Sequence, residues 1–287
     1  MSTYHTSVLL EEVLKGLDVK AGKRYIDATF GGGGHTRALL EQGADVLAID
    51  EDTDALEEAK KIESPHLRIV QGNFRNIETI AKQEGYEQVD GILFDLGVSS
   101  HQINIASRGF SFRYDDAPLD MRFLQVNNDS KSAKELIAKA TENELYEIFA
   151  KYGEEERART IAVHLIRARQ VKPIVTAGQL REVIESVVGT GKASTGTVAR
   201  IFQALRIAVN DEMGALEEGL IGASHLVISG GKIAVISFHS LEDRIVKRFF
   251  RQSAFIEITK KPLIASEEEE TENPRARSAK LRIVQKR

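Results

Sequence analysis

Between Arg24 and Asp95, short apolar runs of strand length alternate with segments whose apolar residues recur at helical spacing. The expected strands are 24–30, 45–50, 67–71 and 90–95, and the expected helices are 7–17, 37–43, 54–62 and 77–83. Strands and helices that alternate at short intervals favour a parallel sheet with helices on its faces. We therefore expect an α/β fold with a doubly wound, Rossmann-like sheet.

The alternation stops after the fourth expected strand, and the pattern is helical from about 107 to 207. Thr141–Glu144 and Thr176–Gln179 have the spacing of capping boxes, and an amphipathic segment follows each of them. Since no convincing strand occurs in this stretch, we expect it to form an all-α domain.

Strand-like runs return after the helical stretch, at 232–238, 256–258 and 281–284. We expect Gly230–Gly231 to form a turn before the first of them, and the acidic run Glu267–Glu270 to be a solvated loop. The sheet domain is therefore predicted to be discontinuous, 1–106 and 208–287. The inserted helical domain, 107–207, is predicted to recognise the substrate.

Composition excludes several kinds of chemistry. The 287 residues include no cysteine, which excludes disulfides, thiolate zinc sites, iron–sulfur clusters and a thiolate nucleophile. The net charge of -4 argues against a protein that coats nucleic acid by bulk electrostatics. No apolar run approaches the roughly 18 residues of a membrane span, and Met1–Thr6 lacks a signal-peptide pattern. We expect a soluble cytoplasmic protein without a membrane partner.

A run of four glycines, Gly31–Gly34, lies between the first expected strand and the helix that follows it. Glycines at this place let the backbone pass close to a ligand, and a helix N-terminus supplies free N–H groups. Asp50 ends the second strand about 20 residues further on, where an acid accepts hydrogen bonds from ribose hydroxyls. Together they predict an adenosine-containing cofactor, with a purely structural glycine turn as the alternative.

Both a nicotinamide dinucleotide and S-adenosylmethionine contain this adenosine. The glycine spacing departs from G-x-G-x-x-G, because four glycines run together before His35. Asp27 precedes the glycines, where a carboxylate attracts the amino group of S-adenosylmethionine and repels a pyrophosphate. The residues therefore favour S-adenosylmethionine as the cofactor.

Asp95 ends the fourth strand, at the edge where open α/β sheets hold their ligands. An acceptor facing the N–H groups of an amine localises the nitrogen lone pair and later takes a proton. We expect Asp95, or backbone carbonyls of the 95–99 loop, to have this catalytic role. A turn or helix cap is the structural alternative for Asp95.

Long strings along nearly the whole chain resemble the bacterial 16S rRNA cytosine-N4 methyltransferases, the ribosomal RNA small subunit methyltransferase H family. The matching strings are His5–Leu10, Ile26–Gly31, Asp95–Ser100, Arg108–Phe112, Pro118–Arg122, Phe202–Ile207, Ser237–Arg244 and Asn273–Ser278. The resemblance implies methylation of the N4 amine of cytosine 1402 in the small ribosomal subunit. It also implies cofactor contacts from Gly33, Gly34, His35, Asp50, Phe74, Asp95 and Gln102. The chain departs from the family at Thr197–Ile201, where the family has a proline-led string.

RNA contacts are expected from aromatic and basic side chains, because extruded bases stack on rings and cations bind phosphates. The candidates are Phe110, Phe112, Phe238, His239, Arg275 and Arg277, and the basic tail also contains Arg282 and Lys286. Core packing is the alternative for the aromatic rings, and a structural role is the alternative for His239. The histidines lack metal-ligand spacing, so we expect no metal. A homodimer is one candidate for the oligomeric state.

Three rival functions stay open. A nicotinamide-dependent oxidoreductase would be protected from unfolding by NAD and not by S-adenosylhomocysteine. A non-catalytic RNA-binding assembly factor would transfer no labelled methyl group. A methyltransferase for another acceptor, such as adenine or a protein amide, would share the cofactor site.

Overall fold

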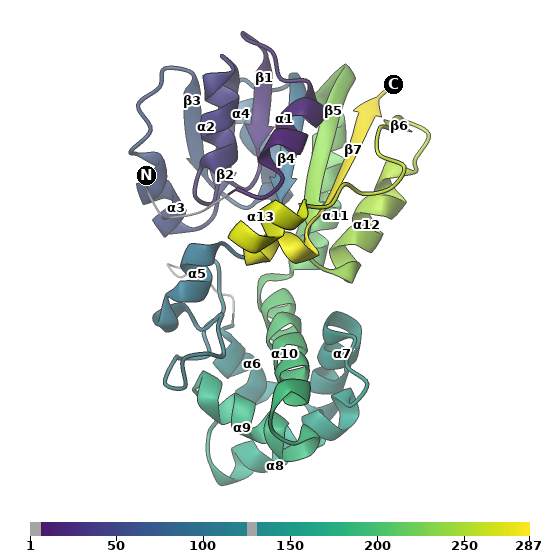
Figure 1. Ribbon diagram of the computed structural model, residues 1–287. Helices are drawn as coiled ribbons and strands as arrows, with labels where there is room; N and C mark the ends of the chain where they lie inside the picture. The colour runs from purple at the N-terminus through teal and green to yellow at the C-terminus, as the bar shows by residue number, and fades with distance from the viewer. Residues whose placement is uncertain (1–6, 125–130) are drawn as a thin grey trace. The chain divides into compact units, whose positions relative to one another are not determined.

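The computed structural model describes residues 7–124 and 131–287, which belong to two compact units (Figure 1). The sheet unit consists of Met1–Ser99 and Met213–Arg287, and the helical unit consists of Ser100–Glu212. Met1–Thr6, where we expect no signal peptide, lie outside the described residues. Among the helices that are described, none is both long enough and apolar enough to cross a membrane.

The described part of the sheet unit contains one sheet, with the strand order β3-β2-β1-β4-β5-β7-β6. The strands are β1 (Arg24–Asp27), β2 (Asp45–Asp50), β3 (Leu67–Gln71), β4 (Val89–Asp95), β5 (Val227–Ser237), β6 (Phe255–Glu257) and β7 (Lys280–Lys286). Strands β1 to β5 pair in parallel, which confirms the predicted α/β class, whereas β7 is antiparallel to β5 and β6. Strand order reverses between β1 and β4, and open α/β sheets bind ligands at the carboxyl ends of such strands.

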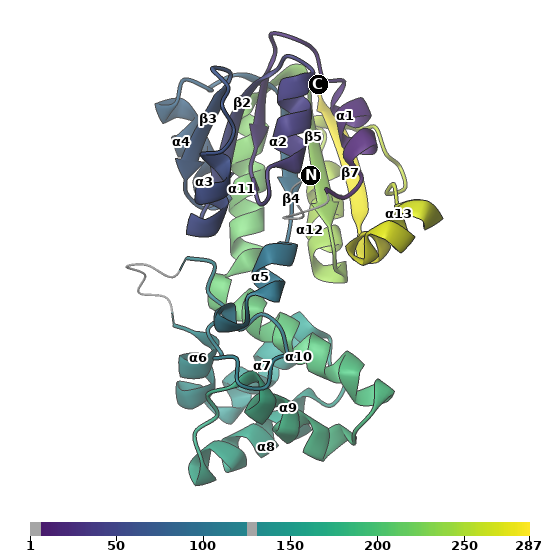
Figure 2. The same cartoon turned by 60° about the vertical axis from the view of Figure 1, so that its left-hand side comes forward.

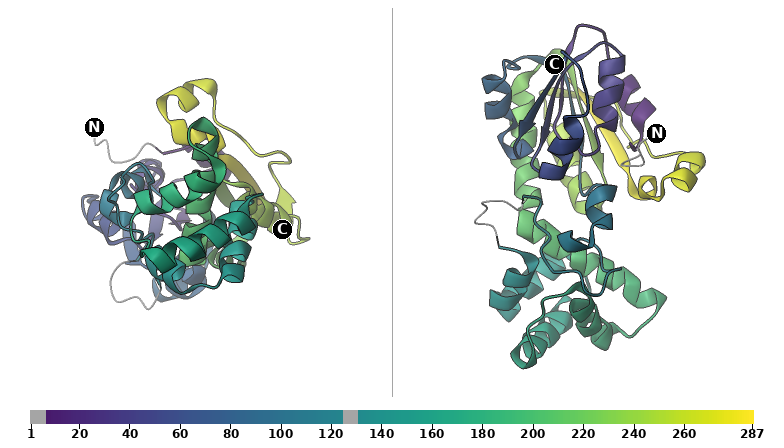
Figure 3. Two further views of the ribbon diagram at one scale, coloured as in Figure 1. Left: turned by 90° about the horizontal axis from the view of Figure 1, so that it is seen from below. Right: turned by 90° about the vertical axis from the view of Figure 1, so that its left-hand side faces the viewer.

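Helices cover both faces of this sheet, as Figure 2 and the right-hand view of Figure 3 show. The helices α1 (Leu10–Leu17), α2 (Gly34–Glu41) and α3 (Thr53–Ala59) pack on one face, and α4 (Ile77–Gln83), α11 (Glu212–Leu226) and α12 (Ser240–Phe250) pack on the other. Within β4, Leu93 faces the first group and Phe94 the second, since adjacent side chains of a strand alternate. Burial on both faces explains why these strands are apolar throughout.

The expected turn at Gly230–Gly231 is wrong, because both residues lie inside β5. The pairing of β5 with β4 shifts register between Val89 and Gly91, and Gly230 has φ 83°. A Cβ on Gly231 would lie 2.9 Å from the Asp90 carbonyl oxygen. The two glycines thus allow a bulge in a strand, where backbones approach closely.

The expected loop at Glu267–Glu270 is also wrong, because these residues begin α13 (Glu267–Glu272). The Ser266 hydroxyl caps this helix by accepting from the Glu269 N–H at 3.2 Å. Acidic side chains in a first helical turn are stabilised by the helix dipole, which accounts for the run. Glu269 also accepts a hydrogen bond from the Leu9 N–H at 2.7 Å, and this contact ties α13 to the start of α1.

The helical unit has its own apolar core. Its helices are seen in the left-hand view of Figure 3. Its helices are α5 (Ser100–Asn104), η2 (Ala106–Arg108), α6 (Ala133–Lys139), α7 (Glu142–Gly153), α8 (Ala158–Val171), α9 (Ala177–Val188) and α10 (Lys192–Asn210). Thr141 caps α7 and Thr176 caps α9 as capping boxes with Glu144 and Gln179, as the sequence predicts. Leu145, Phe149 and Leu205 are fully buried in the core that these helices share.

Candidate functional site

Three acidic residues end neighbouring parallel strands of the sheet unit. Asp27 ends β1, Asp50 ends β2 and Asp95 ends β4, so all three lie at one edge of the sheet. The loop after β1 is hydrogen-bonded to both neighbours, since Phe30 N donates to the Ile49 carbonyl at 2.9 Å and Thr29 Oγ accepts from Asp95 N at 2.6 Å. The candidate cofactor site is thus centred on the β1 loop.

The glycines of this loop occupy places that exclude a side chain. Gly33 has φ 73°, and an added Cβ would lie 2.4 Å from the ring of Phe30. A Cβ on Gly34 would lie 2.0 Å from the Ser7 hydroxyl. Gly34 is also the first residue of α2, which begins earlier than the predicted Arg37. The loop therefore presents bare backbone and a helix N-terminus at the sheet edge, as an adenosine cofactor requires.

Asp27 is buried, at 1% exposed, and it stabilises the loop after β1. One of its oxygens accepts from the Thr36 hydroxyl at 2.7 Å, and the other accepts from Thr29 N at 3.3 Å. Burial raises the pKa of the Asp27 carboxyl, which His35 and Thr36 partly oppose. Contact between Asp27 and a cofactor amino group stays a prediction, whereas its structural role follows from these bonds.

Asp50 joins the glycine loop to the end of β2. Its two carboxylate oxygens accept from Gly31 N at 2.7 Å and from Asp52 N at 2.9 Å. Burial raises the pKa of Asp50 to about 6, against the effect of these two N–H groups. Each carboxylate oxygen has a second acceptor site, so Asp50 can still receive two ribose hydroxyls.

Phe74 lies near the same edge, at the start of η1 (Phe74–Asn76). It follows Gly72, whose N–H donates to the Asp50 carbonyl at 2.9 Å. The ring of Phe74 meets Phe94 edge to face, with centroids 5.6 Å apart. Its half-buried ring is thus fixed beside the end of β2, as a predicted cofactor contact requires.

His35 connects the helix N-terminus to Asp95. Its Nε2 lies 3.1 Å from the Val8 carbonyl oxygen, so this nitrogen must carry the hydrogen. Its Nδ1 lies 3.7 Å from Oδ2 of Asp95. The buried imidazole is therefore fixed by the backbone on one side and faces the carboxylate on the other.

Among the described atoms, Asp95 Oδ1 is buried and has no hydrogen-bond partner. Burial raises the pKa of Asp95, His35 and Arg275 lower it, and Asp27 and Glu242 raise it. A buried acceptor without a hydrogen-bond partner destabilises the fold unless a bound ligand donates a hydrogen bond to it. The arrangement fits a group that accepts a hydrogen bond, and then a proton, from a bound molecule.

Phe238 and His239 form the junction between β5 and α12. Glu242 accepts from the N–H groups of Phe238 at 2.7 Å and His239 at 3.2 Å, while His239 Nδ1 accepts from Glu242 N at 3.4 Å. His239 therefore caps α12, and its other ring nitrogen carries the hydrogen. This structural role leaves RNA contact by His239 as a prediction.

The basic tail contains residues used inside the sheet unit and exposed residues such as Arg277. Arg282 is 6% exposed and donates to both oxygens of Asp243, at 2.6 and 3.2 Å. Lys286 donates to the carbonyl oxygens of Ser224 and Val227 near the end of α11. Arg275 contacts Val98 and Phe238, whereas Arg277 in the same short helix is exposed.

In the helical unit, the predicted aromatic residues pack against other rings. Phe110 stacks on Phe123, with centroids 5.5 Å apart and planes at 25°, and Phe112 meets Phe202 edge to face at 5.5 Å. Gln102 is buried in α5. These three residues stay predictions as RNA or cofactor contacts, and each has a place in the unit's own packing.

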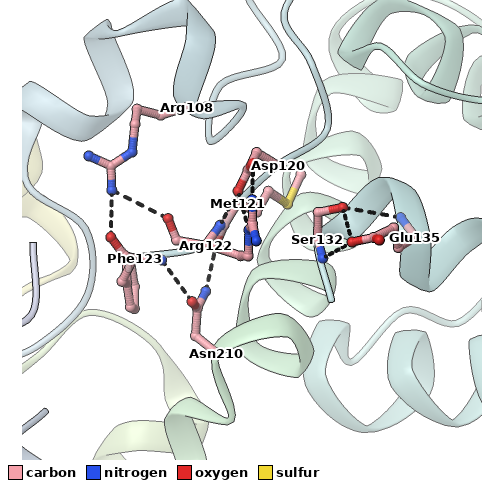
Figure 4. Close-up of polar contacts among 8 residues, drawn as sticks. All are labelled: Arg108, Asp120, Met121, Arg122, Phe123, Ser132, Glu135 and Asn210. Atoms are coloured by element: carbon pink, nitrogen blue, oxygen red, sulfur yellow. Dashed lines mark hydrogen bonds and ion pairs between the residues drawn. The ribbon is translucent and has the colours of Figure 1, made fainter. Parts of the chain in front are cut away.

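The segment that carries Phe123 is held by a polar network that the sequence does not reveal (Figure 4). Asn210 accepts from Phe123 N at 2.9 Å and donates to the Met121 carbonyl at 2.7 Å. Arg108 donates to the carbonyls of Arg122 and Phe123. Met121 is fully buried at φ 63°, a strained conformation for a residue with a side chain. The network therefore fixes the backbone conformation of Met121–Phe123.

Sequence reasoning missed Thr29 and the Val8 carbonyl as parts of the site. Thr29 Oγ accepts from Asp95, 66 residues away, and Val8 holds His35, 27 residues away. Thr29 lies inside a string that resembles the family, so that string was the available signal. A backbone acceptor such as Val8 leaves no signal in its own side chain.

Comparisons with known proteins identify the family of this chain. The sequence profile of the MraW methylase family matches residues 2–287. Ribosomal RNA small subunit methyltransferase H of Deinococcus deserti is 48% identical over 286 residues, which cover 99% of this chain and 94% of that protein. The proteins of that name from Deinococcus radiodurans and Carboxydothermus hydrogenoformans are 47% and 43% identical. The aligned residues make up 97% and 100% of this chain, and 88% and 99% of those two proteins. These matches run through both units.

Proposed function

The chain belongs to the MraW methylase family, and on this premise we propose that it methylates the N4 amine of cytosine 1402 in 16S rRNA. It is an S-adenosylmethionine-dependent methyltransferase, and its substrate is the RNA of the small ribosomal subunit. The observation that carries the proposal is the buried carboxylate of Asp95, whose Oδ1 lacks a partner beside a glycine loop at the sheet edge.

The cofactor fits the residues at this edge. Gly33 and Gly34 would hold the methionine part through their backbone, and Phe30 and Ser7 leave no room for a Cβ at either place. Asp50 receives the ribose hydroxyls, and the ring of Phe74 contacts the adenine. When bound, the sulfonium group supplies an electrophilic methyl carbon. With the donor in place, the chain's task is to align the acceptor amine and accept its proton.

Asp95 activates that amine. The lone pair of cytosine N4 is delocalised into the ring, so a hydrogen bond from its N–H to Asp95 Oδ1 makes the nitrogen more nucleophilic. A bound S-adenosylmethionine would supply the methyl group and keep the electron pair of the broken bond on its sulfur, so the methylated nitrogen would carry an extra proton. The nitrogen then loses a proton to the Asp95 carboxylate, so Asp95 must be ionised at the start. A protonated His35 would stabilise the ionised form, because its Nδ1 lies 3.7 Å from Oδ2 of Asp95.

The remaining predictions concern how the RNA is held. The inserted helical domain recognises the substrate, with Phe110 and Phe112 as base contacts, and Phe238 and the exposed Arg277 meet the RNA from the sheet unit. A role on the small subunit places the enzyme in the cytoplasm. The homodimer is a separate prediction, which light scattering at several protein concentrations tests.

The experiment is transfer of labelled methyl groups from S-adenosylmethionine to small ribosomal subunits that lack the modification. Label on the N4 amine of cytosine 1402 is the expected result, and mapping of the labelled nucleotide identifies the site. Label on another nucleotide or on protein would overturn the acceptor and leave the enzyme class standing. Binding of S-adenosylhomocysteine without any transfer would favour the assembly factor.

The role of Asp95 is tested by Asp95→Asn, which keeps the size of the side chain and removes its basicity. We expect the single-turnover rate with bound cofactor to fall by about 10²- to 10⁴-fold, the range for positioned proton transfer. Asp116→Asn, at an exposed position of the helical unit, is the matched control and should keep the wild-type rate. An unchanged rate in Asp95→Asn would mean that backbone carbonyls of the 95–99 loop suffice.

A further inference from the structure

Arg275 links the loops that follow two neighbouring strands. Its Nη2 donates to the carbonyl of Val98, three residues after the end of β4. Its guanidinium carbon lies 5.5 Å from the centroid of the Phe238 ring, and Phe238 directly follows β5. Since β4 and β5 are adjacent and parallel, this arginine lies at the sheet edge that holds Asp95.

The same aromatic ring also lies close to the loop after β4. Gly97 has φ 87°, and a Cβ built on it would lie 3.7 Å from Cδ2 of Phe238, in ordinary van der Waals contact. Phe238 is itself fixed, because its N–H donates to Glu242 at 2.7 Å. The backbone from Asp95 to Val98 is therefore held at Val98 by the Arg275 guanidinium, and the Phe238 ring that lies under this guanidinium is close to Gly97.

Arg275 is also built into its own segment. It belongs to η3 (Pro274–Ser278), and its N–H donates to Oδ1 of the buried Asn273 at 3.3 Å. An arginine that binds RNA phosphate needs its fork of N–H donors to face solvent. In Arg275, one branch of the fork donates to the backbone carbonyl of Val98, and the guanidinium lies over the ring of Phe238.

We propose that Arg275 is a positioning residue for methyl transfer, which holds the 95–99 loop and thereby places the Asp95 carboxylate. The inference rests on the proposed function of Asp95 as the proton acceptor. It assigns Arg275 a task different from that of Arg277, two residues further along η3, whose side chain is exposed.

The charge of Arg275 supports the same role. Four charged or titratable groups act on Asp95: His35 of α2 and Arg275 of η3 lower its pKa, whereas Asp27 of β1 and Glu242 of α12 raise it, in addition to burial. Because Asp95 must be ionised to take a proton, loss of the Arg275 charge shifts the active form to higher pH.

The test compares Arg275→Gln with Arg277→Gln, which removes the same charge from the same short helix. We expect Arg275→Gln to lower the single-turnover rate at saturating subunits by about ten-fold or more, since small misplacements of reacting groups cost up to about 10²-fold. The rising limb of its pH–rate profile should move to higher pH, because the Arg275 charge lowers the pKa of Asp95. The KM for small subunits should stay within about twofold of wild type.

Arg277→Gln should give the reverse pattern, with a higher KM for subunits and an unchanged saturating rate and pH profile. Arg275→Lys separates charge from geometry, because lysine keeps the charge and loses the planar fork. It should keep the pH profile and lose part of the rate. Thermal unfolding and S-adenosylhomocysteine affinity, both expected near wild-type values, identify any variant that has failed to fold.

A second readout does not depend on catalysis. Amide hydrogen exchange of Gly97, Val98 and Ser99 in the ligand-free protein should speed up in Arg275→Gln and not in Arg277→Gln. Unchanged exchange in Arg275→Gln overturns the inference, and so does a variant whose only defect is a raised KM for subunits. Absence of methyl transfer by the wild-type protein overturns the proposed function instead, and the exchange experiment still decides whether Arg275 holds the loop.

Discussion

The backbone N–H of Gly31 donates to Oδ2 of Asp50 at 2.7 Å, which joins the glycine loop directly to the carboxylate predicted to bind the ribose. The same carboxylate is buried and has a pKa raised to about 6. A group whose pKa is higher in the folded chain than in the unfolded chain opposes folding when it is ionised. In the ligand-free protein this destabilisation grows as pH rises from about 4, the ordinary value for aspartate, through 6.

Cofactor affinity should follow the ionisation of Asp50. Ribose hydroxyls donate more strongly to a carboxylate than to a neutral acid, so binding of S-adenosylhomocysteine should weaken as pH falls below about 6. Calorimetric titrations between pH 5 and 8 measure this dependence. Asp50→Asn should bind about 10- to 100-fold more weakly at pH 7.5, as for loss of hydrogen bonds to a charged group. Its affinity should no longer change with pH around 6, and a persisting pH dependence would assign the titration to another group.

The backbone conformation of Gly33 and the space around it can be tested separately. Gly33→Ala adds a Cβ 2.4 Å from Phe30 at φ 73°, whereas Gly22→Ala has a similar φ of 71° and no atom within 4 Å. Both variants bear the cost of a left-handed alanine, about 1–2 kcal/mol. Only Gly33→Ala should also weaken S-adenosylhomocysteine binding. Equal affinities, measured by calorimetry at a temperature where both variants are folded, would show that the loop tolerates a side chain there.

Asn210 should be a main determinant of stability in the helical unit. Its side chain bonds Phe123 N and the carbonyls of Met121 and Arg206, so Asn210→Ala removes the side-chain partner of Phe123 N and of the Met121 carbonyl. We expect a loss of about 2 kcal/mol in the free energy of unfolding, of the size of an unsatisfied buried polar group. Asn104→Ala, at an exposed position of the same unit, should be nearly neutral. Denaturant unfolding gives both values, and hydrogen exchange should place the difference at Met121–Phe123.

Arg282 should affect stability and not RNA binding. Its ion pair with Asp243 is largely buried, with side chains 8% and 17% exposed. Arg282→Met should cost about 3–5 kcal/mol because it leaves a buried carboxylate without its partner. The double variant with Asp243→Leu should recover much of that loss. Arg251→Met, which removes an exposed arginine, is the control. A raised KM for subunits in Arg282→Met without loss of stability would return this arginine to the RNA-binding surface.

The parallel part of the sheet was predictable, and the reason is local. Runs such as Asp45–Asp50 are apolar throughout because both faces of the sheet are covered, and this leaves a strong pattern in few residues. The family strings predicted the methyltransferase activity and its cofactor, and the match over residues 2–287 confirms the family. Capping boxes at Thr141 and Thr176 were predictable because a cap and its partner lie three residues apart.

The remaining features depend on pairs of residues that are distant in the chain. Nothing in Leu281–Val284 distinguishes an antiparallel strand from a parallel one, since the side-chain period is the same for both. A glycine pair suits a turn as well as a bulge, and the partner strand decides between them at Gly230–Gly231. The sequence pattern does not distinguish the arginines of the basic tail. In the structure, Arg282 is buried and pairs with Asp243, whereas Arg277 is exposed.

The helical unit interrupts the sheet between two strands that pair with each other, with Asp95 of β4 opposite Ile236 of β5. Closing so long a loop from an unfolded chain costs entropy and slows folding. Asn210 reduces that cost once the helical unit has folded, because it bonds Met121 and Phe123 near the other end of the unit. We therefore expect the helical unit to have a kinetic role beside its predicted part in recognition. If it folds first, the pairing of β4 with β5 becomes an encounter between nearby segments.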